Sequence, residues 1–514
     1  MCKCFLFYFL LMVIAACTSP SPRNKQSDYY REPHRLQFHF SPEIGWMNDP
    51  NGLVYHDGEY HLFYQYYPDS TVWGPMHWGH TVSTDLVHWQ HLPIALYPDS
   101  LGYIFSGSAV VDKDNASGFG KEGQISLIAI FTHHDMTGEK AGRTEIETQS
   151  IAYSLDKGRT WTKYAGNPVV KNPGLRNFRD PKVFWHEASK HWIMPIAAGD
   201  HLDFYHSPDL KHWAKTGEFG QSHGAHGGVW ECPDIFPLKT RDGVEKWVLI
   251  QNMDRGAVNG GSGTQYFIGH FDGNTFINDN PSSATLWLDY GADNYAGVTW
   301  FNAPDGRRLF IGWMSQWFDY AQKVPTHPWR SAMTVPRELS LRRTGEELRL
   351  YQLPVPELFH LRTDTIAIAK QEIRDSVKIS ENATLLELEL EFDLSSSTAN
   401  DFGFILKNTK GEKVIVGFQK TDSTFYIDRT NSGKASFSDK FARVDSAPYI
   451  PQGMMKIRAL IDVASIEVFV DDGRLAMTEI FFPNEDYAIT ELFSKGGTIH
   501  LLSSKVYMLK SVWN

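Results

Sequence analysis

The chain has 514 residues, which exceeds the ~250–300 residues of a usual single hydrophobic core and predicts one large and one smaller domain. Aromatic residues make up 14% of the chain, with 16 Trp and 22 Tyr, a supply suited to β cores and to stacking on sugar rings. The net charge of −11, without a basic block, argues against nucleic-acid binding, because a surface that follows phosphates needs concentrated Lys and Arg.

The N-terminus is typical of an export signal. An apolar run, Phe5 to Ala16, follows Lys3 and is too short to span ~30 Å of hydrocarbon, so residues 1–16 are predicted to be a signal peptide. The run ends at Cys17 in a sequence that resembles the lipobox of bacterial lipoproteins, which implies a lipidated Cys17 and an outer-membrane lipoprotein at the cell envelope, facing either the surface or the periplasm. Residues 17–32 then form a polar, Pro-containing tether. Release after ordinary signal cleavage is the alternative.

Residues 33–355 contain a repeated pattern. After Asp49-Pro50, two alternating apolar runs flank a turn at His56–Glu59, which predicts a β-hairpin. Related units begin near residues 49, 106, 180, 231 and 295, at spacings of about 50–75 residues that suit propeller blades. We therefore predict an all-β fold in which a five-bladed β-propeller occupies this region.

The pattern changes after the propeller region. Leu386 to Phe392 alternates strictly between apolar and acidic residues, and Met455 to Phe469 contains two similar runs. This pattern predicts a two-sheet β-sandwich over residues 365–514, joined to the propeller by a linker at 356–364. No carboxylate cluster emerges in the sandwich, which favours a supporting or binding role there over chemistry.

Three acidic residues are expected to face one another in the propeller. Asp49, Asp180 and Glu231 precede the innermost strand of their blades, where such residues reach the mouth of the central channel, and Ser106 and Tyr295 stand near this position in the other blades. Paired carboxylates without a nucleophilic Ser or Cys suggest glycoside hydrolysis. We expect Asp49 to be ionised as the nucleophile, Glu231 to keep a raised pKa as the proton donor, and Arg179 to hold Asp180 ionised.

Several sequence blocks together resemble one enzyme family. WMNDPNG at 46–52, FSGS at 105–108, RDP at 179–181 and EC at 231–232 are similar, in order and spacing, to the signature blocks of glycoside hydrolase family 32, which includes invertases, inulinases and levanases. SIEVFVDDG at 465–473 is similar to the sandwich signature of that family. The resemblance implies a retaining β-fructofuranosidase in which Asp49 is the nucleophile, Glu231 the acid/base and Asp180 the transition-state stabiliser, with no metal or organic cofactor. It also implies a substrate pocket formed by Trp46, Asn48, Gln65, Trp73, Phe105, Ser106, Arg179, Asp293 and Trp313.

The substrate and some alternatives stay open at this point. We expect a fructan as the binding partner and favour levan, with endo or exo action undecided and Trp313–Trp329 as a candidate wall for leaving-group subsites. The alternatives are an exo-inulinase or invertase-type β-fructosidase, an inverting arabinanase-type enzyme and a non-catalytic fructan-binding lipoprotein. A zinc site is a weaker alternative, drawn from four histidines in the first blade: His77, His80, His88 and His91.

Overall fold

The computed structural model describes residues 1, 29–121 and 123–513. The predicted signal peptide, Cys17 and most of the predicted tether lie outside these residues. Within the described part of the chain, no helix is long and apolar enough to cross a membrane.

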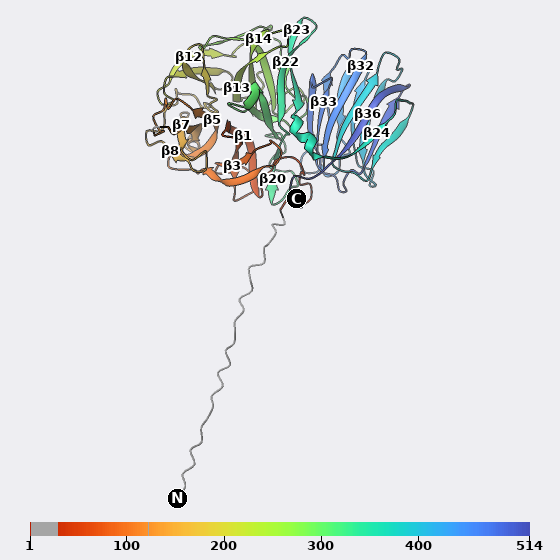
Figure 1. Ribbon diagram of the computed structural model, residues 1–514, viewed down its shortest axis with the longest axis horizontal. Helices are drawn as coiled ribbons and strands as arrows, with labels where there is room; N and C mark the ends of the chain where they lie inside the picture. Colours follow the sequence, from red (N-terminus) through yellow and green to blue (C-terminus); the bar gives the residue numbers. More distant parts are fainter. Residues whose placement is uncertain (2–28, 122, 514) are drawn as a thin grey trace.

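The first half of the chain folds into the first three of five separate sheets arranged around a common centre (Figure 1). The first sheet consists of β1 (Gly45–His56), β2 (Glu59–Tyr67), β3 (His77–Ser83) and β4 (Gln90–Leu96). The second consists of β5 (Tyr103–Asp112), β6 (Ser126–His134), β7 (Glu147–Ser154) and β8 (Thr162–Lys163), with the short helix α1 (Met136–Lys140) between β6 and β7. The third consists of β9 (Phe184–His186), β10 (His191–Ala197), β11 (Leu202–Ser207) and β12 (Ala214–Phe219).

Two more sheets complete the ring. The fourth consists of β13 (Trp230–Lys239), β14 (Glu245–Met253), β15 (Gly263–Phe271), β16 (Phe276–Asn278) and β17 (Leu286–Trp287). The fifth consists of β18 (Tyr295–Thr299), β19 (Leu309–Met314), β21 (Ala332–Met333), β22 (Arg337–Thr344) and β23 (Glu347–Pro354), with the 3-10 turn η1 (Pro304–Gly306) after β18. Strand β20 (Trp329–Arg330) pairs in parallel with β1 and so links the end of the ring to its beginning. The prediction of a five-bladed propeller is confirmed.

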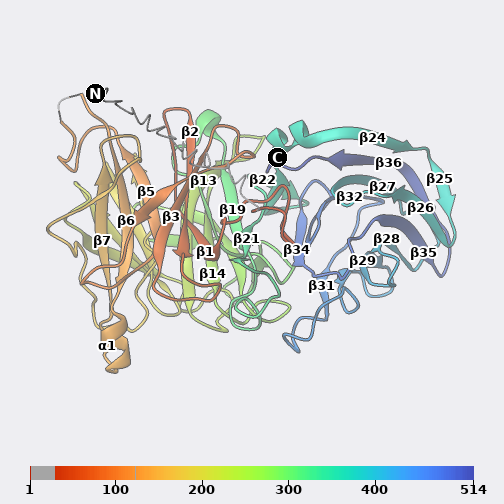
Figure 2. The same ribbon diagram turned by 90° about the horizontal axis from the view of Figure 1, so that it is seen from below.

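The remaining chain forms two packed sheets beside the propeller (Figure 2). One sheet contains β24 (Arg362–Ile368), β25 (Gln371–Ile373), β27 (Leu386–Asp393), β32 (Met454–Asp462), β33 (Ser465–Val470), β34 (Leu475–Ile480) and β36 (Ile499–Leu509). The other contains β26 (Ser376–Glu381), β28 (Asp401–Lys407), β29 (Lys413–Gln419), β30 (Thr424–Asp428), β31 (Val444–Pro448) and β35 (Ile489–Lys495). The alternating Leu side chains of β27 are buried between the sheets, as the period-two pattern predicted.

The segment predicted to be a linker is packed structure. Residues 356–361 form the 3-10 helix η2 (Pro356–Leu361), and β24 begins at Arg362, three residues before the predicted start of the sandwich. Leu358 and Leu361 are buried in the same apolar cluster as Phe469 of the sandwich and Trp300 of the propeller. The two domains therefore share a continuous core, which fixes the propeller against its neighbour.

Candidate active site

The innermost strands of the blades are irregular at the predicted site residues. In β1, Asn48 and Asp49 together lie opposite Gln65 of β2, because the pairing register shifts between Met47 and Pro50. Equivalent shifts occur in the second, fourth and fifth blades, between Ile104 and Gly107, between Glu231 and Asp234, and between Tyr295 and Val298. Such bulges redirect side chains and are common beside active sites. Asp49 and Glu231 thus lie inside β1 and β13, whereas the sequence predicted them to precede these strands.

The third blade presents its carboxylate in a different way. Asp180 precedes β9 and has a positive φ of 64°, a conformation that is uncommon for residues other than glycine. Its backbone N–H donates to Thr132 Oγ1 at 3.1 Å, and its Oδ2 accepts from the backbone N–H of Cys232 at 3.0 Å. These bonds from two neighbouring blades hold the carboxyl at the common centre.

One pocket contains most of the predicted site residues. It has a volume of about 210 Å³ and is lined by all three acids and by the predicted substrate residues Asn48, Gln65, Trp73, Phe105, Ser106 and Arg179. Gln65 is 2% exposed, and no described residue accepts a hydrogen bond from its Nε2. This amide is available to a sugar hydroxyl at the pocket wall.

Asp49 is surrounded by hydrogen-bond donors. Its Oδ1 accepts from Asn48 Nδ2 at 2.9 Å, and its Oδ2 accepts from Ser106 Oγ at 2.7 Å and from Cys232 Sγ at 3.5 Å. Trp46 Nε1 donates to Asn48 Oδ1 at 2.7 Å and so turns the amide nitrogen of Asn48 towards Asp49. Burial nevertheless raises the pKa of Asp49, the charge of Glu231 adds to the rise, and the Asn48 and Ser106 donors oppose it.

Arg179 contacts Glu231 more closely than it contacts Asp180. Its Nη2 donates to Glu231 Oε1 at 2.7 Å, whereas its Nε lies 4.0 Å from Asp180 Oδ2. Burial raises the pKa of Asp180 to about 8; Arg179 opposes the rise, and the charges of Glu231 and Asp49 add to it. The expectation that Arg179 would hold Asp180 ionised was therefore wrong, and the guanidinium donates to Glu231 instead. The guanidinium of Arg179 contacts Glu231 in β13 of the fourth blade, so adjacency in sequence did not predict the closer contact.

Three predicted pocket residues do not line the pocket. Trp46 and Trp313 are fully buried and pack behind it, with ring centroids 5.9 Å apart, and both contact Trp317, which does line it. Asp293 is fully buried and bonds Tyr320 Oη and Arg429 Nη1, each at 2.7 Å, so it joins the propeller to the sandwich. The carboxylate of Asp293 is thus explained by its buried ion pair with Arg429 and not by contact with a substrate.

The pocket also contains residues that were not predicted as site residues. Tyr295 donates its hydroxyl to Glu231 Oε2, and its place in the fifth repeat, near the position that the acids hold in other blades, was a usable sequence signal. The other such residues come mainly from α1, β7 and the loop before Arg179, where no motif marks them: His134, Glu139, Ile146, Glu147, Arg176 and Asn177. Trp317 also lines the pocket and belongs to Trp313–Trp329, the segment predicted as a candidate wall for leaving-group subsites.

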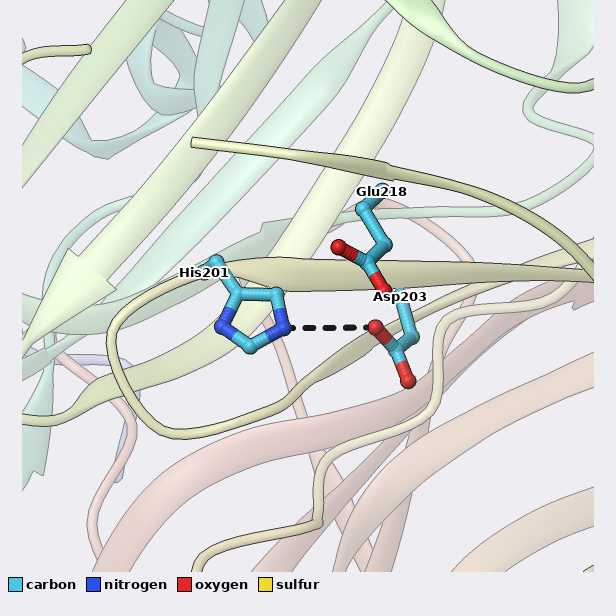
Figure 3. Close-up of side chains that lie close together, drawn as sticks. All are labelled: His201, Asp203 and Glu218. Atoms are coloured by element: carbon cyan, nitrogen blue, oxygen red, sulfur yellow. Dashed lines mark ion pairs between the residues drawn. The ribbon is translucent and has the colours of Figure 1, made fainter. Parts of the chain in front are cut away.

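A cluster of possible metal ligands lies in the third blade, away from this pocket. His201, Asp203 and Glu218 bring their side chains together at the β11–β12 edge (Figure 3). Lys215 Nζ already lies 2.9 Å from Asp203 Oδ1 and 2.5 Å from Glu218 Oε1. A positive charge thus occupies the position that a cation would need, and the cluster is an ion-pair network.

The four histidines of the first blade have separate partners. The nearest polar contacts are Pro75 O for His77 at 2.8 Å, His61 Nδ1 for His80 at 3.0 Å, Asp85 Oδ2 for His88 at 2.8 Å and Tyr30 Oη for His91 at 2.5 Å. This arrangement gives the zinc alternative no support.

Comparison with known proteins identifies the family. Residues 39–354 match the N-terminal domain of glycosyl hydrolases family 32, and residues 357–508 match the C-terminal domain of the same family. The chain belongs to glycosyl hydrolases family 32. A levanase of Bacillus subtilis (strain 168) is 48% identical over 95% of this chain and 72% of its own length. An extracellular exo-inulinase of Aspergillus awamori is 40% identical over 94% of this chain and 96% of its own length.

Solved structures agree with this membership. The crystal structure of exo-inulinase from Aspergillus awamori superposes with a TM-score of 0.87 at 37% identity, covering 94% of this chain and 100% of that chain. The family 32 resemblance of the sequence blocks is thus confirmed, and the protein is a glycosidase.

Proposed function

We propose that this family 32 enzyme is a retaining, exo-acting β-fructofuranosidase that removes fructose from fructan chains and prefers levan. One observation carries the mechanism: two carboxyls line the same pocket and are held by different partners. Asp49 accepts from Asn48, Ser106 and Cys232, whereas Glu231 accepts from Arg179 and Tyr295. A retaining glycosidase needs two such carboxyls, one as the nucleophile and one as the acid/base.

The reaction proceeds in two steps. Asp49 attacks C2 of the terminal fructosyl unit while Glu231 gives its proton to the departing glycosidic oxygen, and a covalent fructosyl-enzyme forms. Glu231, now ionised, takes a proton from water; the water oxygen attacks C2, and Asp49 is released. Asp180, fixed by Cys232 N–H and Thr132, hydrogen-bonds the sugar hydroxyls as positive charge develops on the ring.

The pocket supports exo action. Its volume of about 210 Å³ is below the ~300–1,000 Å³ of sites that enclose drug-sized ligands, so it suits one terminal sugar. Trp73, Phe105 and Trp317 form aromatic walls on which a sugar ring can pack. The preference for levan is supported by the 48% identity to a levanase, against 40% to an exo-inulinase.

Product analysis tests this proposal. The purified protein is incubated with levan, inulin and sucrose, and products are followed by chromatography and by proton NMR in the first minutes. From levan and inulin we expect fructose as the main early small product, and from sucrose fructose together with glucose. The fructose should be released first as the β-anomer, with the highest kcat/KM on levan. Early oligosaccharides would contradict exo action, and the α-anomer would contradict a nucleophilic Asp49.

Substitution of the two carboxyls tests the roles directly. Glu231→Gln should lower kcat by ~10²–10⁴-fold, the usual contribution of a positioned acid or base. Asp49→Ala removes the nucleophile that forms the covalent intermediate and should lower kcat by at least as much. Both variants should keep the wild-type circular dichroism and melting temperature. Ordinary activity in either folded variant would refute the mechanism.

We further propose that Cys17 is lipidated and anchors the enzyme to the outer membrane. The support is the apolar run that ends at Ala16-Cys17, followed by a polar segment. In a Gram-negative host, we expect the wild-type protein in the membrane fraction, from which detergent extracts it. The Cys17→Ser variant should be found in the aqueous fraction instead. Unchanged membrane association of this variant would contradict lipid anchoring at Cys17.

A further inference from the structure

A continuous series of polar contacts leads from Glu231 to the rim of the pocket. Arg179 donates through Nη2 to Glu231 Oε1 at 2.7 Å and through Nη1 to Glu147 Oε1 at 3.2 Å. Glu147 Oε1 also lies 3.2 Å from His134 Nδ1, and His134 Nε2 lies 3.2 Å from Glu139 Oε2 on α1. The acid/base is therefore linked through one guanidinium to a second carboxylate that the reaction itself does not use.

Glu147 is a buried and ionised partner of Arg179. It is the first residue of β7, and its side chain is 2% exposed. Burial alone would raise its pKa, yet the pKa lies below the usual value, because Arg179, His134 and the Phe178 N–H stabilise the charged form. The Phe178 N–H donates to Glu147 Oε2 at 2.6 Å and fixes the carboxylate in place.

We propose that Glu147 is a positioning residue that holds Arg179 between two carboxylates and thereby keeps Glu231 able to carry a proton. An arginine that served Glu231 alone would favour its ionised form, which suits a proton donor poorly. Glu147 balances part of that positive charge and adds a negative charge of its own, and both effects favour the protonated form of Glu231. The inference rests on the proposed acid/base role of Glu231.

Other groups also face these two carboxyls. Glu231 is surrounded by Arg179 and Tyr295, by the acids Asp49, Asp180 and Asp254, and by Cys232. Glu147 faces Arg179 and His134, with Glu139 and Arg176 paired beyond them. Of the residues that the structure describes, Arg179 is the side chain that donates to both carboxylates. Removal of the Glu147 charge therefore acts on Glu231 in two ways: Arg179 loses its second carboxylate partner, and the direct repulsion between the two carboxylates is lost.

The pH dependence of kcat/KM for Glu147→Gln tests the inference. The substitution keeps the shape and an acceptor for the Phe178 N–H but removes the charge. The basic limb of the profile reports loss of the proton from the group that acts as the acid in the free enzyme, which in the proposed mechanism is Glu231. We expect this limb to move to lower pH by about 0.5–1 unit, so that kcat/KM on the basic side falls about three- to tenfold.

Controls separate this role from a structural one. Glu187→Gln removes the same charge from a 75% exposed side chain in the third blade and should leave both limbs unchanged. Glu147→Asp keeps the charge farther from Arg179 and should move the basic limb less, in the same direction; it also serves if Glu147→Gln does not fold. A uniform loss of kcat/KM with an unmoved basic limb, or a limb that moves to higher pH, would overturn the inference.

The outcome is distinguishable from failure of the proposed function. If wild type releases no fructose, or if Glu231→Gln remains active, the proposed function fails. If both behave as proposed and the basic limb of Glu147→Gln does not move, only the role of Glu147 fails.

Discussion

The buried contact of His39 with the sandwich predicts a pH-dependent stability. His39 Nδ1 lies 2.8 Å from Asp462 Oδ2, and Nε2 lies 2.9 Å from Glu467 Oε1, with all three side chains fully buried. Burial lowers the pKa of His39, but the two carboxylates outweigh it and raise the pKa from 6.5 to about 9. In the folded protein the ring is therefore an imidazolium that donates from both nitrogens.

The sign and size of the effect follow from this shift. A raised pKa means that the folded state binds the proton more tightly, so the stabilisation is fully present below pH 6.5 and is lost as the pH rises through about 9. A shift of about 2.5 units, at 1.36 kcal/mol for each unit, corresponds to about 3 kcal/mol. Stability should thus fall by about 3 kcal/mol between pH 6 and pH 9.5 from this group alone.

Urea unfolding, followed by tryptophan fluorescence at pH 6 and pH 9.5, measures the effect. Other groups titrate in this range, so the informative quantity is the difference between wild type and His39→Gln, which cannot take up the proton. We expect the advantage of wild type over the variant to shrink by about 3 kcal/mol from pH 6 to pH 9.5. An advantage that is the same at both pH values would refute the imidazolium assignment.

Two further predictions concern the pocket and the domain interface. Ser106→Ala removes a donor to Asp49 and should raise the pKa of that carboxyl further, which moves the acidic limb of the kcat/KM profile to higher pH; an unmoved acidic limb would count against Asp49 as its source. Asp293→Asn weakens the buried contact with Arg429 and should lower the free energy of unfolding by about 1–3 kcal/mol, with KM for sucrose unchanged. A raised KM with unchanged stability would contradict this structural role and would support the original prediction that Asp293 binds substrate.

Much of the architecture was predictable because it repeats. Alternating apolar runs and turns recur in every blade, so the propeller and the convergence of Asp49, Asp180 and Glu231 followed from periodicity alone. The bulges were not predictable, since an extra residue in a strand changes no residue type. The places of Glu147 and Asp293 also escaped prediction, because their partners lie 32 and 136 positions away in sequence.

The domain interface shows that buried charged residues alone do not identify a catalytic site in this protein. Arg337 is fully buried and bonds Glu467 of the sandwich and Asp289 of the propeller, at a centre as rich in charge as the pocket. There, Glu467 accepts from Arg337, His39 and the Val335 N–H, and these groups hold its pKa below the usual value although burial would raise it. In the pocket, Asp49, Asp180 and Glu231 face one another with Arg179 as the nearby cation, and burial together with the neighbouring negative charge raises the pKa values of Asp49 and Asp180. The three acids of the pocket line a cavity that a ligand can enter, whereas Glu467 and Asp289 at the interface are buried, so access to a ligand distinguishes the site of chemistry from the domain interface.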